Sequence, residues 1–189
     1  MRSLLRKVGF LPSKRSFKME NLSAFSLPIG GLRTGTHRFE FTLDREFFAQ
    51  IPDSIVSDGD VKAIVELDKQ ATMYILEFDL EGTVRTDCDR CLQPFDLPID
   101  VQQRLTLKFG EGPEDADVEY IQRDESRFNV APFCYEFTVL DIPMSKTHDD
   151  ADQDCDPEMI EHLERASSQT DTDEGGSVWD ALKDLNNND

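Results

Sequence analysis

The chain has 189 residues, with 39 acidic against 20 basic residues and a formal net charge of −19. This length suggests one principal domain, and 38% hydrophobic residues with 13 Phe are enough to build a core. Such a negative surface repels phosphate backbones, which argues against sequence-independent nucleic-acid binding and makes basic proteins the natural partners. No apolar run approaches the length that spans a bilayer, so no membrane association is expected.

Residues 1–18 are predicted to form a basic, disordered N-terminal extension. The segment carries six basic residues before Met19 and no acidic one. Its apolar stretches are short and are interrupted by Arg6 and Lys7, which argues against a signal peptide. A transit peptide, a basic anchoring arm and an over-extended gene start with the initiator at Met19 remain as interpretations.

Residues 19–146 are predicted to form a β-rich core. Apolar and polar residues alternate with a period of two in several short runs, which is the pattern of half-buried strands. Short strands separated by turns indicate an antiparallel meander. The residues after the first run, "DREFFAQI", are expected to form one helical turn capped by Asp44. The alternating runs occupy 37–44, 60–69, 72–80 and 83–87, with turns at Gly30-Gly31 before the first and at Glu81-Gly82 before the last.

The longest alternating run spans residues 97–109. A strand of this length usually bends and can be shared between two sheets, so the core could be two-sheeted or barrel-like. Pro98 lacks an N–H donor and is expected near an edge or at the start of the strand. The odd positions of this run are Leu97, Ile99, Val101, Gln103, Leu105, Leu107 and Phe109.

A short strand over 118–122 and a helix capped by Asn129 and running through Asp141 are predicted to complete the core. A strand is the alternative for the second element, and Pro143 ends either one. The predicted fold class is therefore α+β and β-rich, with an antiparallel core and a few short helices, mostly C-terminal. The side of the helix expected to be apolar holds Val130, Phe133, Cys134, Phe137 and Leu140.

Residues 147–189 are predicted to form an acidic C-terminal segment with two short helices. Asp156-Pro157 is a favourable helix start, and "PEMIEHLERA" is expected to follow it as an amphipathic helix. A solvated linker then leads to "SVWDALKDL", in which Trp179, Leu182 and Leu185 face one way.

The sequence Cys88-Asp-Arg-Cys91 is the main chemical signal in the core. Two cysteines separated by two residues form a knuckle that presents both sulfurs to one tetrahedral ion. His148 and Cys155, in the polar segment after Pro143, have the residue types of the missing ligands. The set Cys88, Cys91, His148 and Cys155 therefore predicts a Zn²⁺ site, although His-x6-Cys is an uncommon spacing. A metal-free structural turn stays open as the alternative.

A dithiol oxidoreductase is the other chemistry that Cys88 and Cys91 suggest. The flanking carboxylates of Asp87 and Asp89 disfavour a thiolate, so they are expected to raise the pKa of Cys88. No βαβ pattern surrounds the motif. Cys134 lies on the apolar side of its segment and is predicted to be a buried, unreactive thiol. We therefore expect no catalytic residue and no small-molecule substrate.

The segment "EGTVRTDCDRCLQPFDLPI", a strand that enters a C-x2-C-L turn and leaves through an aromatic and a proline, resembles the YceD family. That family is known for large ribosomal RNA subunit accumulation. The upstream "LPIGGLRTGTHRFEFTLDREFF" and the downstream "YEFTVLDIPMSKTHDDADQDCDPEMIEHL" also resemble family segments, as does the ending "WDALKDL". Cys88 and Cys91 match the family motif directly, whereas His148 and Cys155 match a looser pattern.

This resemblance implies a non-enzymatic, cytoplasmic factor in ribosome biogenesis that supports accumulation of the large-subunit ribosomal RNA. The net negative charge favours a basic ribosomal protein or a pre-ribosomal particle as the partner, with indirect contact to ribosomal RNA. A module that binds ribosomal RNA directly is the alternative, and it requires a local basic patch. The residues that could supply such a patch are Arg33, Arg38, Lys62, Lys69 and Arg104.

Overall fold

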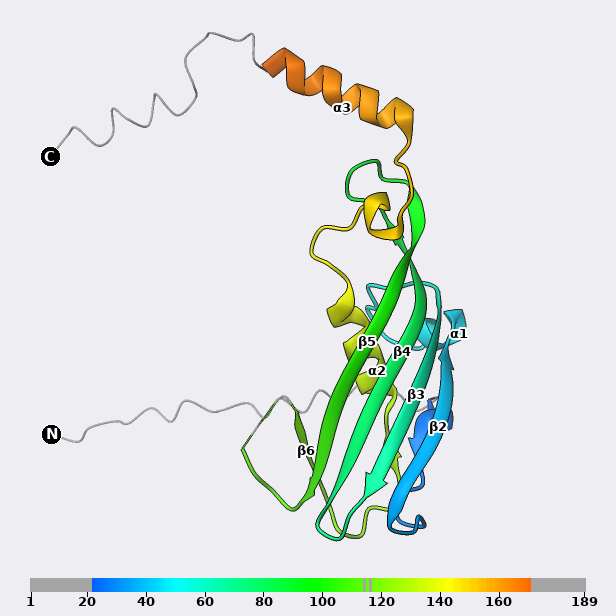
Figure 1. Cartoon of the computed structure of the whole chain (residues 1–189), viewed down its shortest axis with the longest axis vertical. Helices are drawn as coiled ribbons and strands as arrows, with labels where there is room; N and C mark the ends of the chain where they lie inside the picture. Colours follow the sequence, from blue (N-terminus) through cyan, green and yellow to red (C-terminus); the bar gives the residue numbers. More distant parts are fainter. Residues whose placement is uncertain (1–21, 114, 116, 171–189) are drawn as a thin grey trace, which may run out of the picture.

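A computed structural model describes residues 22–113, 115 and 117–170, and its centre is a long, twisted β-sheet (Figure 1). The predicted basic extension of residues 1–18 and the predicted helix around Trp179 lie outside the described residues. Among the described helices, none is long and apolar enough to cross a membrane.

The main sheet has five strands in the order β2-β3-β4-β5-β6. The first four form the predicted antiparallel meander, and β6 lies parallel to β5. A separate two-stranded sheet joins β1 to β7. The antiparallel, β-rich fold class is confirmed, and the five strands form an open sheet rather than a barrel. The strands are β1 (Ser26–Leu27), β2 (Gly35–Leu43), β3 (Gly59–Lys69), β4 (Met73–Asp87), β5 (Pro94–Phe109), β6 (Val118–Ile121) and β7 (Phe128–Asn129).

β4 is one continuous strand, so the turn expected at Glu81-Gly82 is wrong. Glu81 pairs with Asp100 of β5, and Gly82 pairs with Val61 of β3. A Cβ atom at position 82 would lie 2.1 Å from the backbone oxygen of Asp60. Glycine therefore lets β3 approach β4 closely inside the sheet, and does not mark a reversal of the chain.

β5 keeps its alternation over its whole length and belongs to one sheet only. Its odd positions face the core, except that Gln103 is exposed. Because β6 pairs only with Thr106–Phe109, the first part of β5 has β4 as its single strand neighbour. Pro98 lies in that part, where its missing N–H removes no bond to a further strand.

Two short helical elements precede the sheet or join its strands, a 3-10 turn η1 (Ser23–Phe25) and the helix α1 (Arg45–Ala49). The N–H of Phe47 donates to the side chain of Asp44 at 2.9 Å, which is the predicted cap of α1. The buried Phe47 and Phe48 then anchor α1 in the core.

The helix α2 (Ala131–Asp141) covers one face of the sheet. Phe137 packs edge-on against Phe78 of β4, with ring centroids 5.1 Å apart. Asn129 is not the N-cap, because Val130 holds that position, although the N–H of Ala131 donates to the side chain of Asn129 at 3.0 Å.

The apolar side expected for α2 is partly wrong. Leu140 is 71% exposed, whereas Cys134 and Thr138 are fully buried. Thr138 is tolerated inside because its hydroxyl donates to the carbonyl oxygen of Cys134 at 2.8 Å, which satisfies its polar group.

The C-terminal part of the described chain holds a 3-10 turn, η2 (His148–Ala151), and the helix α3 (Pro157–Thr170). α3 begins at Pro157 as predicted and continues beyond the expected ten residues to Thr170. The hairpin of β4 and β5 extends past β3, because Gly59 of β3 pairs with Val84 and leaves Arg85–Asp87 paired with β5 alone. η2 lies beside this hairpin tip, and α3 leads away from it (Figure 1).

Candidate metal centre

The tip of the β4–β5 hairpin is a tight turn that carries both cysteines of the C-x2-C motif. The N–H of Cys88 donates to the carbonyl of Gln93, and the N–H of Leu92 donates to the carbonyl of Cys88, each at 2.9 Å. Leu92 has a left-handed backbone with a φ of 63°, which costs a non-glycine residue about 1 kcal/mol. This strained turn directs the sulfurs of Cys88 and Cys91 into the protein, where both side chains are fully buried.

The sulfur of Cys88 lies against backbone donors of its own turn. The N–H groups of Arg90 and Cys91 point at it from 3.4 and 3.5 Å. Burial raises the pKa of Cys88, but these two donors and His148 together lower it to about 6. The expectation that Asp87 and Asp89 raise this pKa is therefore wrong.

Asp89 is turned toward Lys146 and fixes the chain after α2 against the hairpin tip. The backbone N–H of Lys146 donates to one oxygen of Asp89 at 2.8 Å, and its ammonium group donates to the other at 3.0 Å. The N–H of Asp89 in turn donates to the carbonyl of Lys146 at 2.8 Å. These bonds lower the pKa of Asp89, and Arg90 adds an ion pair to Asp149. These bonds hold the hairpin tip and the chain around Lys146, which are far apart in sequence, in a fixed position relative to each other.

η2 places the ring of His148 beside the sulfurs of the cysteines. Thr147 and Asp150 form a capping box at its start, in which the N–H of Thr147 donates to Asp150 at 2.7 Å. The His148 ring packs against Phe95 of β5 in a tilted arrangement with centroids 4.8 Å apart, and only 7% of the residue is exposed. Asp152, with a left-handed φ of 53°, then turns the chain toward Cys155.

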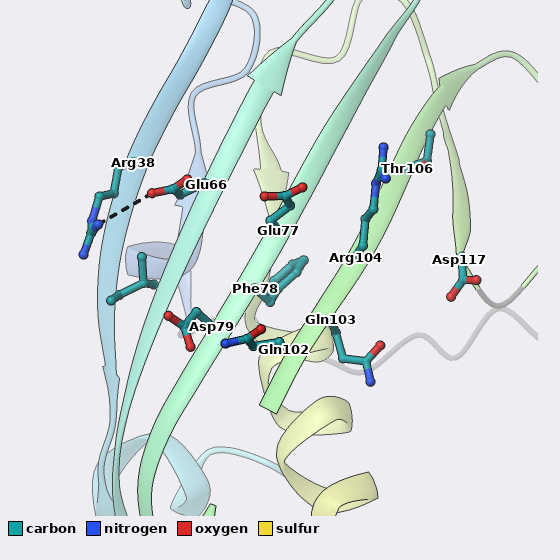
Figure 2. A pocket seen from close by; sticks show the side chains of 11 residues that line it. Arg38, Glu66, Glu77, Phe78, Asp79, Gln102, Gln103, Arg104, Thr106 and Asp117 are labelled. Atoms are coloured by element: carbon teal, nitrogen blue, oxygen red, sulfur yellow. Dashed lines mark ion pairs between the residues drawn. The ribbon is translucent and has the colours of Figure 1, made fainter. Parts of the chain in front are cut away.

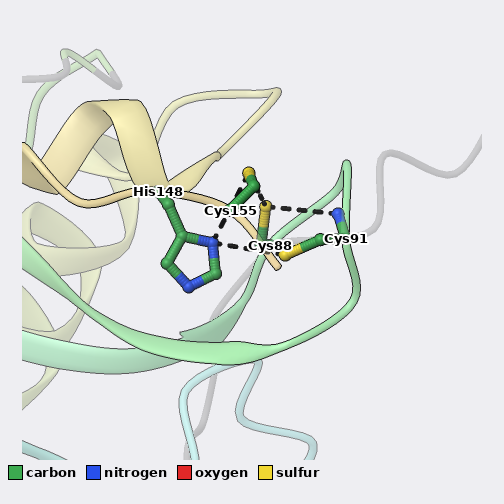
Figure 3. Close-up of side chains that lie close together, drawn as sticks. All are labelled: Cys88, Cys91, His148 and Cys155. Atoms are coloured by element: carbon green, nitrogen blue, oxygen red, sulfur yellow. Dashed lines mark hydrogen bonds between the residues drawn. The ribbon is translucent and has the colours of Figure 1, made fainter. Parts of the chain in front are cut away.

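The four predicted ligands, Cys88, Cys91, His148 and Cys155, lie together, with their donor atoms all within 4.8 Å of one another. His148 Nδ1 is 3.4 Å from the sulfur of Cys91 and 3.8 Å from that of Cys155 (Figure 3). The sulfurs of Cys88 and Cys155 are also 3.8 Å apart.

The three separations of 3.4 to 3.8 Å are close to those of ligands around one tetrahedral ion, and the other pairs of donor atoms lie within 4.8 Å. With Zn–S bonds of about 2.3 Å and a Zn–N bond of about 2.0 Å, tetrahedral geometry separates two sulfurs by about 3.8 Å and a sulfur from a nitrogen by about 3.5 Å. Three of the residues are buried and Cys155 is half-buried. The cluster could therefore bind a metal ion without large rearrangement.

The residues that support the cluster were not identified from the sequence. The contact of Asp89 with Lys146 joins residues 57 positions apart and leaves no local signal. The pair Thr147 and Asp150 does leave one, because a threonine followed three positions later by an acidic residue is a recognisable capping pattern. That pattern marks the start of η2, and so the position of His148.

Cys134 lies in α2 and is not a member of the cluster. It is fully buried, as predicted, and burial raises its pKa to about 12.

Cys134 should consequently resist alkylation in the folded protein. With iodoacetamide and a chelator near pH 7.5, we expect Cys134 to stay unmodified until denaturant is added, because both access and the thiolate fraction are very small. Peptide mass spectrometry before and after addition of guanidinium measures this. Alkylation of Cys134 in the native protein at the rate of a free thiol would contradict its burial.

Comparison with known families gives one match. The family model described as "Large ribosomal RNA subunit accumulation protein YceD" matches residues 76–186, which is more than half of the chain. This range begins within β4 and contains all four residues of the cluster. Neither the curated proteins nor the solved structures gave a match.

Proposed function

Because the chain belongs to the YceD family, we propose that it is a non-enzymatic factor of the cytoplasm that supports accumulation of the large-subunit ribosomal RNA. The family match over residues 76–186 is the observation that carries this proposal. The family is described by the RNA whose accumulation it supports, and its description names no reaction.

The partner in this proposal is a basic protein, either a ribosomal protein or a component of a pre-ribosomal particle. The net charge of −19 favours it over RNA, because negative surfaces repel phosphate groups. Three of the five cations considered for an RNA-binding patch are also engaged within the protein. Arg38 pairs with Glu40 and Glu66, Lys62 pairs with Glu40, and the ammonium group of Lys69 donates to the carbonyl of Ile29.

We assign Cys88, Cys91, His148 and Cys155 as the ligands of one structural Zn²⁺. Three thiolates and an imidazole fill all four positions of a tetrahedral ion, which is typical of structural rather than catalytic zinc. Such an ion would fasten the start of the acidic C-terminal segment to the β4–β5 hairpin. The dithiol alternative requires an accessible thiolate, yet Cys88 and Cys91 are both fully buried. Reduction of insulin at a rate above background would support the dithiol alternative instead.

Deletion of the gene in the source organism tests the function. We expect a lower ratio of large-subunit to small-subunit ribosomal RNA, restored by the wild-type gene. Affinity purification from native lysate should retain ribosomal proteins after ribonuclease treatment if the contact is protein-mediated. An unchanged RNA ratio would overturn the proposed function, and loss of all partners on ribonuclease treatment would favour direct RNA binding.

A further inference from the structure

The two faces of the main sheet differ in what covers them. One face carries the core side chains, and α2 packs on it through Phe133 and Phe137 against Phe78. On the opposite face, the outward positions of β4 include Glu77, Asp79 and Glu81, which are exposed. Within the described part of the chain, no helix covers these positions, so this face is open to a partner.

The open face is hollowed. A groove of about 700 Å³ crosses it, lined by side chains of β2 to β5 that include Arg38, Glu66, Glu77, Asp79 and Arg104 (Figure 2). A second hollow of about 330 Å³ shares Glu66, Glu77 and Arg104 with it. Together they form one concave region over the middle of the sheet, and the outward Ile64 and Ile75 line its two parts.

The charges on this face are unevenly compensated. On β2 and β3, Glu40 and Glu66 form ion pairs with Arg38 and Lys62. Among the described residues, the carboxylates of Glu77, Asp79 and Glu81 form no ion pair. Arg104 and Lys108 of β5 are the nearby cations still available, but they are outnumbered. The carboxylates that line the two hollows are Glu66, Asp68, Glu77, Asp79 and Asp117, and Glu40, Glu81 and Asp100 are exposed on the same sheet.

The carboxylates of Glu77, Asp79 and Glu81 also have a regular spacing along β4. Alternate residues of a strand lie about 6.8 Å apart on the same face, so Glu77, Asp79 and Glu81 form an acidic row along β4. An extended peptide has the same repeat between alternate side chains. Lysine or arginine at every second position of such a peptide would therefore meet one carboxylate after another.

We propose that this open face binds an extended segment of a basic protein, lying along β4 with lysine or arginine at alternate positions opposite Glu77, Asp79 and Glu81. The inference deepens the proposed function and rests on it, since it gives the basic partner a place to bind. Ile64 and Ile75 contact the aliphatic stems of the basic side chains, which bury apolar atoms while their charged ends reach the carboxylates. Phosphate groups are repelled from the same surface.

Two triple variants with equal loss of charge test the proposal. The first is Glu77→Gln with Asp79→Asn and Glu81→Gln, which neutralises the acidic row. The control is Glu158→Gln with Glu161→Gln and Glu164→Gln, which removes the same charge from the exposed α3. Thermal unfolding and circular dichroism of both variants check that the fold is retained.

The probe is a fluorescein-labelled peptide of six Lys-Thr repeats, titrated by fluorescence anisotropy. Exposed ion pairs contribute modestly, so loss of three should weaken binding by about tenfold, whereas the α3 control should change it by less than about twofold. A peptide of the same composition with its lysines clustered should bind more weakly than the alternating one. Equal weakening by both variants, equal binding of both peptides, or no binding by the wild type would overturn the proposal.

A complementation experiment in cells tests this proposal separately from the proposed function. Expression of the β4 triple variant in the deletion strain should fail to restore the large-subunit RNA. Full restoration of the RNA by a variant that no longer binds the peptide would contradict the proposed docking surface. It would leave the proposed function intact. If the deletion itself leaves the RNA ratio unchanged, the proposed function fails whatever the peptide titrations give.

Discussion

Cys88→Ser is expected to abolish zinc binding and to lower the stability of the protein strongly. Wild-type protein purified without chelator should contain about one Zn²⁺ per chain, and the variant should contain almost none. Serine keeps the size of the side chain but replaces the thiolate in a buried cluster whose geometry fits a tetrahedral ion. Loss of a structural metal is among the changes that cost about 4 kcal/mol or more, which corresponds to a fall of about 10 °C in the unfolding midpoint.

Cys134→Ala is the matched control for this measurement. It removes a buried cysteine outside the cluster, so it should lower stability through a small cavity and keep its full zinc content. Elemental analysis of the three proteins, together with thermal scans with and without chelator, gives both readouts. Stoichiometric zinc in Cys88→Ser, or no zinc in wild-type protein supplied with it, would show that Cys88 is not a ligand.

The strands could be predicted because one face of the sheet is buried. Where the core takes every second residue, as in β3 and β5, the sequence alternates and the period of two is visible. The same alternation cannot show how strands are joined. Glycine at position 82 predicts a turn because glycine is common in turns, whereas here it is required by the close approach of the Asp60 backbone.

The ligand types of the candidate site could be predicted, but not the contacts that bring them together. A C-x2-C motif signals a knuckle from local spacing alone. His148 reaches it because Lys146 binds Asp89 and because the imidazole packs against Phe95, and both contacts join distant parts of the chain. An uncommon spacing such as His-x6-Cys is compatible with a tetrahedral cluster when η2 and the left-handed Asp152 reverse the chain between the two ligands.

The pKa of Cys88 shows how sequence neighbours can mislead. Asp89 is adjacent in the chain, but its carboxylate is bound to Lys146. Burial raises the pKa of this sulfur, and the groups that lower it are instead the backbone N–H donors of Arg90 and Cys91 together with His148, which the neighbouring residue types do not reveal. The local shape of the turn therefore decides the charge state that is favoured at this position.

Gly82→Ala is expected to destabilise the protein more than the addition of a methyl group at any other position of the sheet. The new Cβ would lie 2.1 Å from the oxygen of Asp60 and 2.7 Å from the Cα of Val61, both backbone atoms of β3. Neither atom can move away as a flexible side chain would, because β3 is held by ladder bonds to β2 and β4. We expect a loss of about 3–5 kcal/mol in the free energy of unfolding, measured by urea denaturation.

Gly31→Ala is the matched control, because it adds the same methyl group at a turn. Its Cβ would meet only the carbonyl oxygen of Pro28, at an ordinary 3.9 Å, so the free energy of unfolding should change by less than about 0.5 kcal/mol. The difference in the free energy of unfolding between the two variants separates the clash between the paired strands β3 and β4 from the general effect of replacing glycine. If Gly82→Ala were as stable as Gly31→Ala, β4 could not run straight through position 82 beside β3. The turn predicted from the sequence would then be the better description of that position.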